Sequence, residues 1–133
     1  MKKSGIINAQ LAGYIAGLGH MDLFLIGDAG LPIPPGIPIV DLALCKDVPT
    51  FDQVMDAIME EAVVEYYYLA EEIQEKNERL LKYIQNTLPD TKFEMMPHIS
   101  FKLMTKNVKF AIRTGEFSPY PNIILRAGVA FPA

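Results

Sequence analysis

Apolar and polar positions follow a helical period in some segments of the chain and a strand period in others. An i, i+3, i+4, i+7 stripe over residues 11–18 predicts a first helix, capped by Asn8 and ended by Gly19 in the left-handed conformation. A second stripe over residues 51–59 follows capping-box spacing at Thr50 and predicts another helix. Each helix has one apolar face, so each must pack against another layer.

Short apolar runs and further helical stripes fill the rest of the chain. The predicted strands are 23–26, 63–69, 92–95, 109–113 and 123–127, and the further predicted helices are 71–88, ended by Pro89, and 97–105. The segment 29–38 is dense in Pro and Gly and predicts a stiff loop. Strands and helices therefore alternate, which predicts a single α/β domain over residues 1–133. We expect a central, mostly parallel or mixed sheet flanked by helices, with a strand order that periodicity does not define.

The composition fits one globular domain that does not act as a monomer. A chain of 133 residues buries about two-thirds of the surface that its unfolded state exposes. Half of the residues are hydrophobic, which leaves more apolar surface than a monomer of this size easily hides. We therefore expect a homo-oligomer.

Charge and cysteine usage exclude several classes of partner. The net charge of −4 and the absence of a Lys/Arg cluster argue against binding to nucleic acid or to an anionic membrane surface. Cys45 is the only cysteine, the first residues lack the apolar core of a secretory signal, and no apolar run reaches the roughly 20 residues that cross a bilayer. We expect a cytoplasmic protein that has no membrane segment.

The two histidines lie where predicted helices end or begin. His20 follows the first helix, whose partial negative charge at the C-terminus favours the imidazolium form. His98 follows Pro97 at a helix start, where the positive end of the helix favours neutral imidazole. Environments that separate two similar groups in this way predict an acid and an acceptor. Asp22 could orient the His20 ring by accepting its second N–H.

Other polar and aromatic residues have structural interpretations beside functional ones. Asp28 follows the first predicted strand, where aspartate commonly forms a turn before a glycine. Arg113 and Glu116 are expected to form an internal ion pair rather than to bind a ligand. The run from Tyr66 to Tyr68 could stack on a sugar, but consecutive strand residues face opposite sides, so at least one of them belongs to the core or to an interface.

Two segments of the chain carry a family resemblance. The segments are Gly19 to Pro32, with a Gly-His-x-Asp and an Asp-Ala-Gly-Leu-Pro motif, and Arg113 to Leu125, with a Tyr-x-Asn motif. Both closely resemble the D-ribose pyranase family, the sugar mutarotases of ribose uptake, and the resemblance covers essentially the whole chain. It implies a ring-like homo-oligomer, a homodecamer of stacked pentamers.

The resemblance also implies roles for particular residues. His20 matches the family's proton donor. The positions that match substrate-binding residues are Asp28, His98, Tyr120, Pro121 and Asn122. The sequence has no P-loop, dinucleotide fingerprint or spaced set of metal ligands, so we expect neither a cofactor nor a metal.

Three positions depart from the family pattern. Pro121 stands where a small residue is common, and proline removes a backbone N–H from the substrate-binding segment. Met21 replaces a frequently polar neighbour of the proton donor, and Ile99 replaces an acidic residue after His98. The surroundings of both histidines are therefore more apolar than usual, which predicts a change in activity or in sugar preference.

The spacing of two of these residues has a geometric consequence. If residues 21–27 are extended at roughly 3.3 Å per residue, His20 and Asp28 lie on the order of 20 Å apart. That distance is too long for both side chains to touch one sugar. Either the strand is bent or the site joins two chains.

The resemblance implies the function of a D-ribose pyranase, which interconverts the pyranose and furanose forms of ribose by general acid–base ring opening and closure. One alternative is a mutarotase for L-fucose or another monosaccharide, which shares the Gly-His and Tyr-x-Asn motifs. Another is a non-catalytic, sugar-binding regulatory protein. A phosphate-binding loop at residues 27–36 is disfavoured, because its prolines remove N–H donors and no lysine follows.

Overall fold

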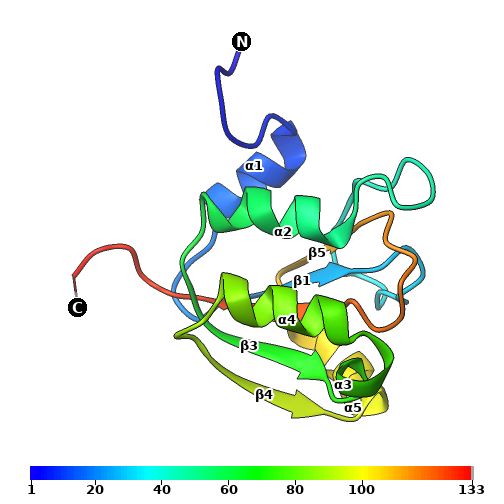
Figure 1. The fold of residues 1–133 in the computed structure, drawn as a ribbon. Helices are drawn as coiled ribbons and strands as arrows, with labels where there is room; N and C mark the ends of the chain where they lie inside the picture. The colour runs from blue at the N-terminus through cyan, green and yellow to red at the C-terminus, as the bar shows by residue number, and fades with distance from the viewer. Residues whose placement is uncertain (133) are drawn as a thin grey trace.

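The elements alternate along the chain and assemble around a six-stranded sheet within residues 1–132, the part of the chain that this computed structural model describes (Figure 1). The helices are α1 (Ala9–Ala16), α2 (Phe51–Met59), α3 (Ile73–Lys76), α4 (Glu78–Thr87), α5 (His98–Met104) and the 3-10 helix η1 (Thr105–Asn107). The strands are β1 (Leu23–Gly27), β2 (Ile39–Asp41), β3 (Val64–Ala70), β4 (Lys92–Met96), β5 (Phe110–Arg113) and β6 (Ile123–Ala127). The predicted α/β domain with a mixed sheet is confirmed. None of the described helices is long and apolar enough to span a bilayer.

The strand order is β2-β5-β1-β6-β3-β4. The β1–β5, β2–β5 and β3–β4 pairs are parallel, whereas β6 is antiparallel to both of its neighbours, β1 and β3. Five strands of the described sheet therefore point one way and β6 points the other. We call the edge where the five strands end and β6 begins the carboxyl edge, and the opposite edge the amino edge.

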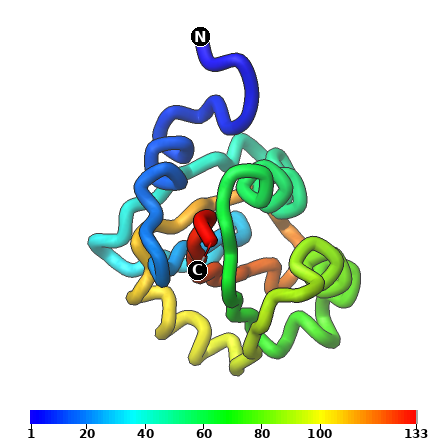
Figure 2. Tube along the Cα trace, turned by 90° about the vertical axis from the view of Figure 1, so that its left-hand side faces the viewer, coloured from blue at the N-terminus to red at the C-terminus, as the bar shows by residue number. Residues whose placement is uncertain are grey.

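Helices cover both faces of the sheet. On one face, α1, α2, α3 and α4 pack over side chains such as Phe24, Ile26 and Leu125. On the other face, Phe101 of α5 packs over Leu25 and its neighbours, together with the Pro-rich loop 31–38. This alternation follows from the strand period, which sends successive side chains to opposite faces. Figure 2 looks along the strands from the amino edge, with the helices arranged around the sheet.

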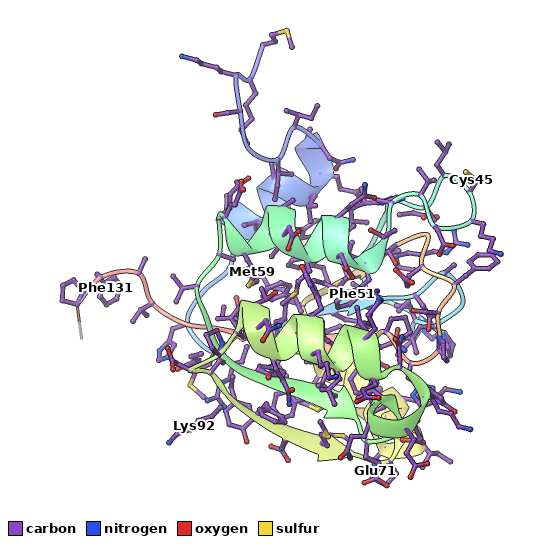
Figure 3. The ribbon with its side chains drawn as sticks, viewed as in Figure 1. Cys45, Phe51, Met59, Glu71, Lys92 and Phe131 are labelled. Carbon is purple, nitrogen blue, oxygen red and sulfur yellow. The ribbon has the colours of Figure 1, made fainter. Side chains whose placement is uncertain are left out.

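The interface between α2 and α4 is anchored at the start of α2. Thr50 and Gln53 form the predicted capping box. Phe51 is fully buried and lies between α2 and α4 (Figure 3). Its backbone N–H donates a 2.8 Å hydrogen bond to the buried carboxylate of Glu116, so the loop before β6 is tied to this helix.

Two predictions about local structure are wrong, and one strand was not predicted. The stripe 71–88 forms two helices that break at Asn77, instead of one. The first helix ends at Ala16, its C-cap Gly17 keeps a right-handed φ of −85°, and the left-handed residue that follows is Met21 with φ 73°, not Gly19. Strand β2 was not predicted at all, because its three residues follow Pro38 and pair in parallel only with β5, which is distant in sequence.

We predict that Gly115→Ala destabilises the fold. A Cβ at this position would lie 2.6 Å from the carbonyl oxygens of Cys45 and Val48, so the backbone of that loop would have to move. The expected loss is about 1–3 kcal/mol in the free energy of unfolding. Gly13→Ala is the matched control, because its Cβ would meet nothing within 4 Å, and it should raise stability by about 0.5–1 kcal/mol. Thermal unfolding at fixed protein concentration measures both, and a Gly115→Ala protein as stable as the parent would contradict the steric argument.

Candidate functional site

Asp28 and Asn122 meet at the carboxyl edge. Asp28 directly follows β1 and Asn122 directly precedes β6, so the antiparallel pairing brings them side by side. The Asp28 N–H donates to Asn122 Oδ1 at 2.8 Å, and Asn122 Nδ2 donates to Asp28 Oδ2 at 3.2 Å. Asp28 Oδ1 accepts the Gly30 N–H at 2.8 Å, which is the turn that the sequence predicted. Asn122 is buried, and Asp28 is half-buried, so the carboxylate is held in a fixed orientation at the surface.

Tyr120 lies in the same edge, on a loop that is held by buried polar side chains. Asn77 donates from Nδ2 to Ser118 Oγ at 2.9 Å and to the Pro119 carbonyl at 2.8 Å. Tyr120 itself has φ 56°, a left-handed conformation that costs a non-glycine residue roughly 1–2 kcal/mol. Pro121 is buried and, as predicted, has no N–H to offer. The break between α3 and α4 at Asn77 thus supplies the side chain that positions Tyr120.

His98 completes the cluster at the carboxyl edge. Its ring meets the Tyr120 ring edge-on, with 5.0 Å between centroids and an 84° angle. Its backbone N–H donates to both carboxylate oxygens of Glu72, at 2.9 and 3.1 Å. Burial lowers the pKa of His98 below its usual value of 6.5, and Lys102 adds to this, while Glu72 and Asp28 oppose it. His98 Nδ1 is buried and has no hydrogen-bond partner within the described chain. A neutral imidazole with one unsatisfied nitrogen suits a hydroxyl ligand.

His20 lies at the amino edge, in a turn that precedes β1. Asp22 Oδ2 accepts the Gly19 N–H at 2.7 Å, and Lys109 Nζ donates to Asp22 Oδ2 at 3.0 Å and to the Gly17 carbonyl at 2.7 Å. These contacts hold the pKa of Asp22 below its usual range, the Gly19 hydrogen bond being the main cause. Asp22 therefore fixes the turn and does not orient the His20 ring, which corrects the sequence-based hypothesis.

The contact of the His20 ring is with Glu65, which sequence reasoning missed. His20 Nε2 lies 2.9 Å from Glu65 Oε1, and Arg126 Nε lies 3.4 Å from the same oxygen. Glu65 is the second residue of β3, and Arg126 is the fourth residue of β6. A charged residue near the start of an otherwise apolar and aromatic strand was the available signal. The partner could not be predicted because the strand order was unknown.

Other polar and aromatic residues named from the sequence have structural roles. Arg113 forms an ion pair with Asp41 at 3.0 Å and donates to the Ala29 carbonyl, so the predicted pair of Arg113 with Glu116 is wrong. Tyr67 is in the core, as the alternation argument predicted for at least one of the three tyrosines.

The predicted site residues thus form two groups. Asp28, His98, Tyr120 and Asn122 lie at the carboxyl edge, and His20 lies at the amino edge, before β1. A cavity of about 490 Å³ adjoins His20 and is lined by Leu18, Glu61, Val63 and residues 127–131, but by none of the carboxyl-edge residues. The described residues contain no group of three or more His, Cys, Asp or Glu side chains that could hold a metal ion.

The chain is a small α/β protein with polar side chains clustered at the carboxyl edge of its sheet and a histidine turn at the amino edge. This combination defines the class of protein to which a known family corresponds. The model of the RbsD / FucU transport protein family matches residues 1–130, and the chain belongs to this family.

Individual proteins and solved structures are also similar to this chain. The chain is 46% identical to a D-ribose pyranase of Limosilactobacillus fermentum and 45% identical to one of Bacillus subtilis; each match spans 131 residues, 98% of this chain and all of the relative. The structure of Bacillus subtilis RbsD complexed with D-ribose superimposes with a TM-score of 0.94 at 45% identity, over 98% of this chain and all of the other. The fucose mutarotase of Streptococcus pneumoniae shares the fold, with a TM-score of 0.79 at 19% identity over 94% of this chain and 95% of the other.

We predict that His98 titrates with a midpoint below pH 6.5. The lowered pKa means that the unfolded state binds a proton more readily than the folded state does between the two midpoints. The contribution of His98 to stability is therefore complete above about pH 6.5 and is lost as the pH falls through the lowered midpoint. NMR titration of the two histidine Cε1–H signals, assigned with His98→Gln, measures this directly. A His98 midpoint at or above 6.5 would contradict the burial argument.

Proposed function

We propose that the protein is a D-ribose pyranase, an isomerase that interconverts the pyranose and furanose forms of ribose. The observation that carries the proposal is the full-length match, at 45–46% identity, to proteins named D-ribose pyranase. The TM-score of 0.94 against RbsD in complex with D-ribose supports the same substrate. The chemistry of the carboxyl edge is compatible with it, because a fixed carboxylate and a neutral imidazole are acceptors and donors for sugar hydroxyls.

The reaction needs proton transfers and no change of oxidation state. Ring opening removes the proton of the anomeric hydroxyl, breaks the bond between the anomeric carbon and the ring oxygen, and delivers a proton to that oxygen. Ring closure repeats these steps in reverse with a different hydroxyl. We assign the proton donation to His20, and the binding of hydroxyls to Asp28, His98, Tyr120 and Asn122. Pro121 contributes to the binding segment through its carbonyl and its fixed backbone alone.

The separation of the two groups leads to the second part of the proposal. His20 and Asp28 flank the five residues of β1, which span roughly 15 Å, so one sugar cannot touch both in one chain. We propose that each site takes His20 from one copy and the carboxyl-edge residues from a neighbouring copy. A ring-like homo-oligomer, such as a decamer of two stacked pentamers, provides this contact at every subunit. Exposed apolar side chains beside both groups support it: Met21 next to His20, and Ile99 and Leu103 on α5.

The proposed cellular compartment rests on the state of Cys45. Cys45 is exposed and free, which fits a reducing environment, and we place the protein in the cytoplasm.

The first experiment measures ring exchange. We expect the protein to accelerate magnetisation transfer between the pyranose and furanose NMR signals of D-ribose. General acid–base groups typically contribute about 10²–10⁴-fold, so His20→Ala should lose at least about 10²-fold of the acceleration while it still binds ribose. L-Fucose is the control sugar. Ribose binding without any acceleration by the parent protein would instead support a sugar-binding regulatory protein, and acceleration of fucose alone would support the other mutarotase class.

The second experiment tests whether the site is shared between copies. His20→Ala and Asp28→Asn are each expected to be inactive alone, and Asp28→Asn keeps the acceptor for the Gly30 N–H. When the two variants are refolded together, about a quarter of the shared sites recover both native residues, so about a quarter of the parent activity should return. A mixture of the parent with the double variant is the control for subunit exchange. If every site lies within one chain, the mixture of single variants stays inactive.

A further inference from the structure

The contact between Glu65 and His20 has a role that the proposed function leaves open. We infer that Glu65 is a positioning residue for His20: its carboxylate fixes the orientation of the imidazole ring, and Arg126 holds that carboxylate in place. This inference rests on the proposed function, in which His20 is the proton donor. It adds the residue that selects which ring nitrogen faces the sugar.

The His20 ring needs such a partner because little else constrains it. Its side chain is 52% exposed, and it lies in a turn rather than on a helix or strand. An exposed imidazole samples several rotamers, and each rotamer points the acidic N–H in a different direction. The 2.9 Å approach of Glu65 Oε1 to Nε2 favours one of them.

The carboxylate of Glu65 is well placed to serve as this partner. Its Oε1 is buried and has no aligned hydrogen bond within the described chain, and the same holds for Arg126 Nε. A buried carboxylate oxygen is costly unless a cation or a hydrogen-bond donor meets it. The imidazolium form of His20 and the Arg126 guanidinium are the two cations within reach, at 2.9 and 3.4 Å.

Arg126 is fixed from its other side. Its guanidinium carbon lies 4.8 Å from the centre of the Tyr66 ring, within the range of a cation–π interaction. Arg126 also pairs in register with Tyr66 on β3 and with Leu23 on β1, so its backbone is part of the sheet. Glu65 is therefore held by a rigid element, and His20 by Glu65.

Three other charged groups near the His20 turn are engaged elsewhere. Asp22 and Lys109 bind each other and the backbone of the turn. Glu61 lines the same cavity as His20, but its Oε2 accepts the Ile6 N–H at 2.6 Å and its Oε1 lies 4.0 Å from Lys2 Nζ. Glu65 is thus the acidic group that is free to contact the ring.

This arrangement assigns different tasks to the two ring nitrogens. Nε2 is held against Glu65, and Nδ1 remains free to face a sugar bound at the carboxyl edge of a neighbouring copy. The proton that reaches the ring oxygen of the sugar then leaves from Nδ1, while the bond between that oxygen and the anomeric carbon breaks. Reprotonation of Nδ1 by the hydroxyl that is deprotonated in ring closure restores the donor.

The kinetic test compares Glu65→Gln, which removes the charge at nearly constant shape, with Glu65→Asp, which keeps the charge. We expect Glu65→Gln to lower the ribose exchange rate at saturating ribose about tenfold or more, because a misoriented His20 loses part of its contribution as a general acid. The half-saturating ribose concentration should stay within about twofold of the parent value. Glu65→Asp should retain more of the rate. Glu78→Gln on α4 removes the same charge from an exposed i, i+4 pair with Lys82 and should match the parent. The inference is wrong if Glu65→Gln keeps the parent exchange rate or changes only the half-saturating ribose concentration. It is also wrong if Glu65→Asp loses as much of the exchange rate as Glu65→Gln does.

A second measurement tests positioning without any reference to activity. The chain has two histidines, so ring ¹³C labelling yields two sets of signals, and His98 acts as the internal reference. Relaxation of the ring carbons should show an ordered His20 ring in the parent and in Glu65→Asp, and a more mobile one in Glu65→Gln, with His98 unchanged. A His20 ring equally ordered in Glu65→Gln would overturn the inference.

If the parent protein does not accelerate ribose exchange, the proposed function fails, and the order of the His20 ring alone decides the role of Glu65. Thermal unfolding and size-exclusion profiles equal to the parent exclude a general loss of structure.

Discussion

The structure depends on the placement of one reversed strand inside a sheet that is otherwise parallel. β6 lies between β1 and β3 and forms antiparallel ladders with both, and its Ile123, Ile124 and Leu125 are fully buried. Because β6 runs against its neighbours, its first residues reach the edge where β1 and β3 end. Asn122 thereby fixes Asp28, and at the other end Arg126 meets Glu65. A single five-residue strand thus connects the two edges of the sheet at which the predicted site residues lie.

Most elements could be predicted from the sequence because their signals are local. The apolar stripe of α2 and its capping box depend on residues within a few positions of each other, and so do the short apolar runs of β1 and β6. The predicted extension of the segment before Asp28 is also present, since β1 is a strand over Leu23–Gly27, with His20 before it at the amino edge and Asp28 after it at the carboxyl edge.

The errors occurred where a distant partner decides the local structure. β2 exists because β5 offers it a parallel partner, and the helical stripe over 71–88 breaks because the Asn77 side chain binds the loop at Ser118 and Pro119. Ion-pair partners that are distant in sequence could not be predicted either. Arg113 was expected to pair with a residue three positions away, yet its partner is Asp41, directly opposite on the neighbouring strand β2. The partner of His20 belongs to β3, which only the strand order identifies.

The different surroundings of the two histidines have a cause other than the one that the sequence suggested. The C-terminal end of α1 cannot act strongly on His20, because the helix ends at Ala16 and the field of a helix falls off within its last turn. The carboxylate of Glu65 is the negative charge beside the ring instead. His98 is kept neutral chiefly by burial. Burial thus determines the direction of the pKa shift of His98, whereas the feature that distinguishes His20 is its contact with a carboxylate.

His20 and the carboxyl-edge residues lie at opposite ends of β1. An assembly in which neighbouring copies share sites therefore has a direction. Each copy then presents a donor end and a receiving end, and a string of copies has one complete site fewer than it has chains. Closing the string into a ring adds a site without adding a chain, which is possible only when the rotation between neighbours divides a full turn. In the proposed ring, a copy that is released would keep the residues assigned to sugar binding and would lose the His20 of its neighbour. If the proposal holds, closing the assembly is part of forming the active site, and the rate of ribose exchange reports on the integrity of the oligomer.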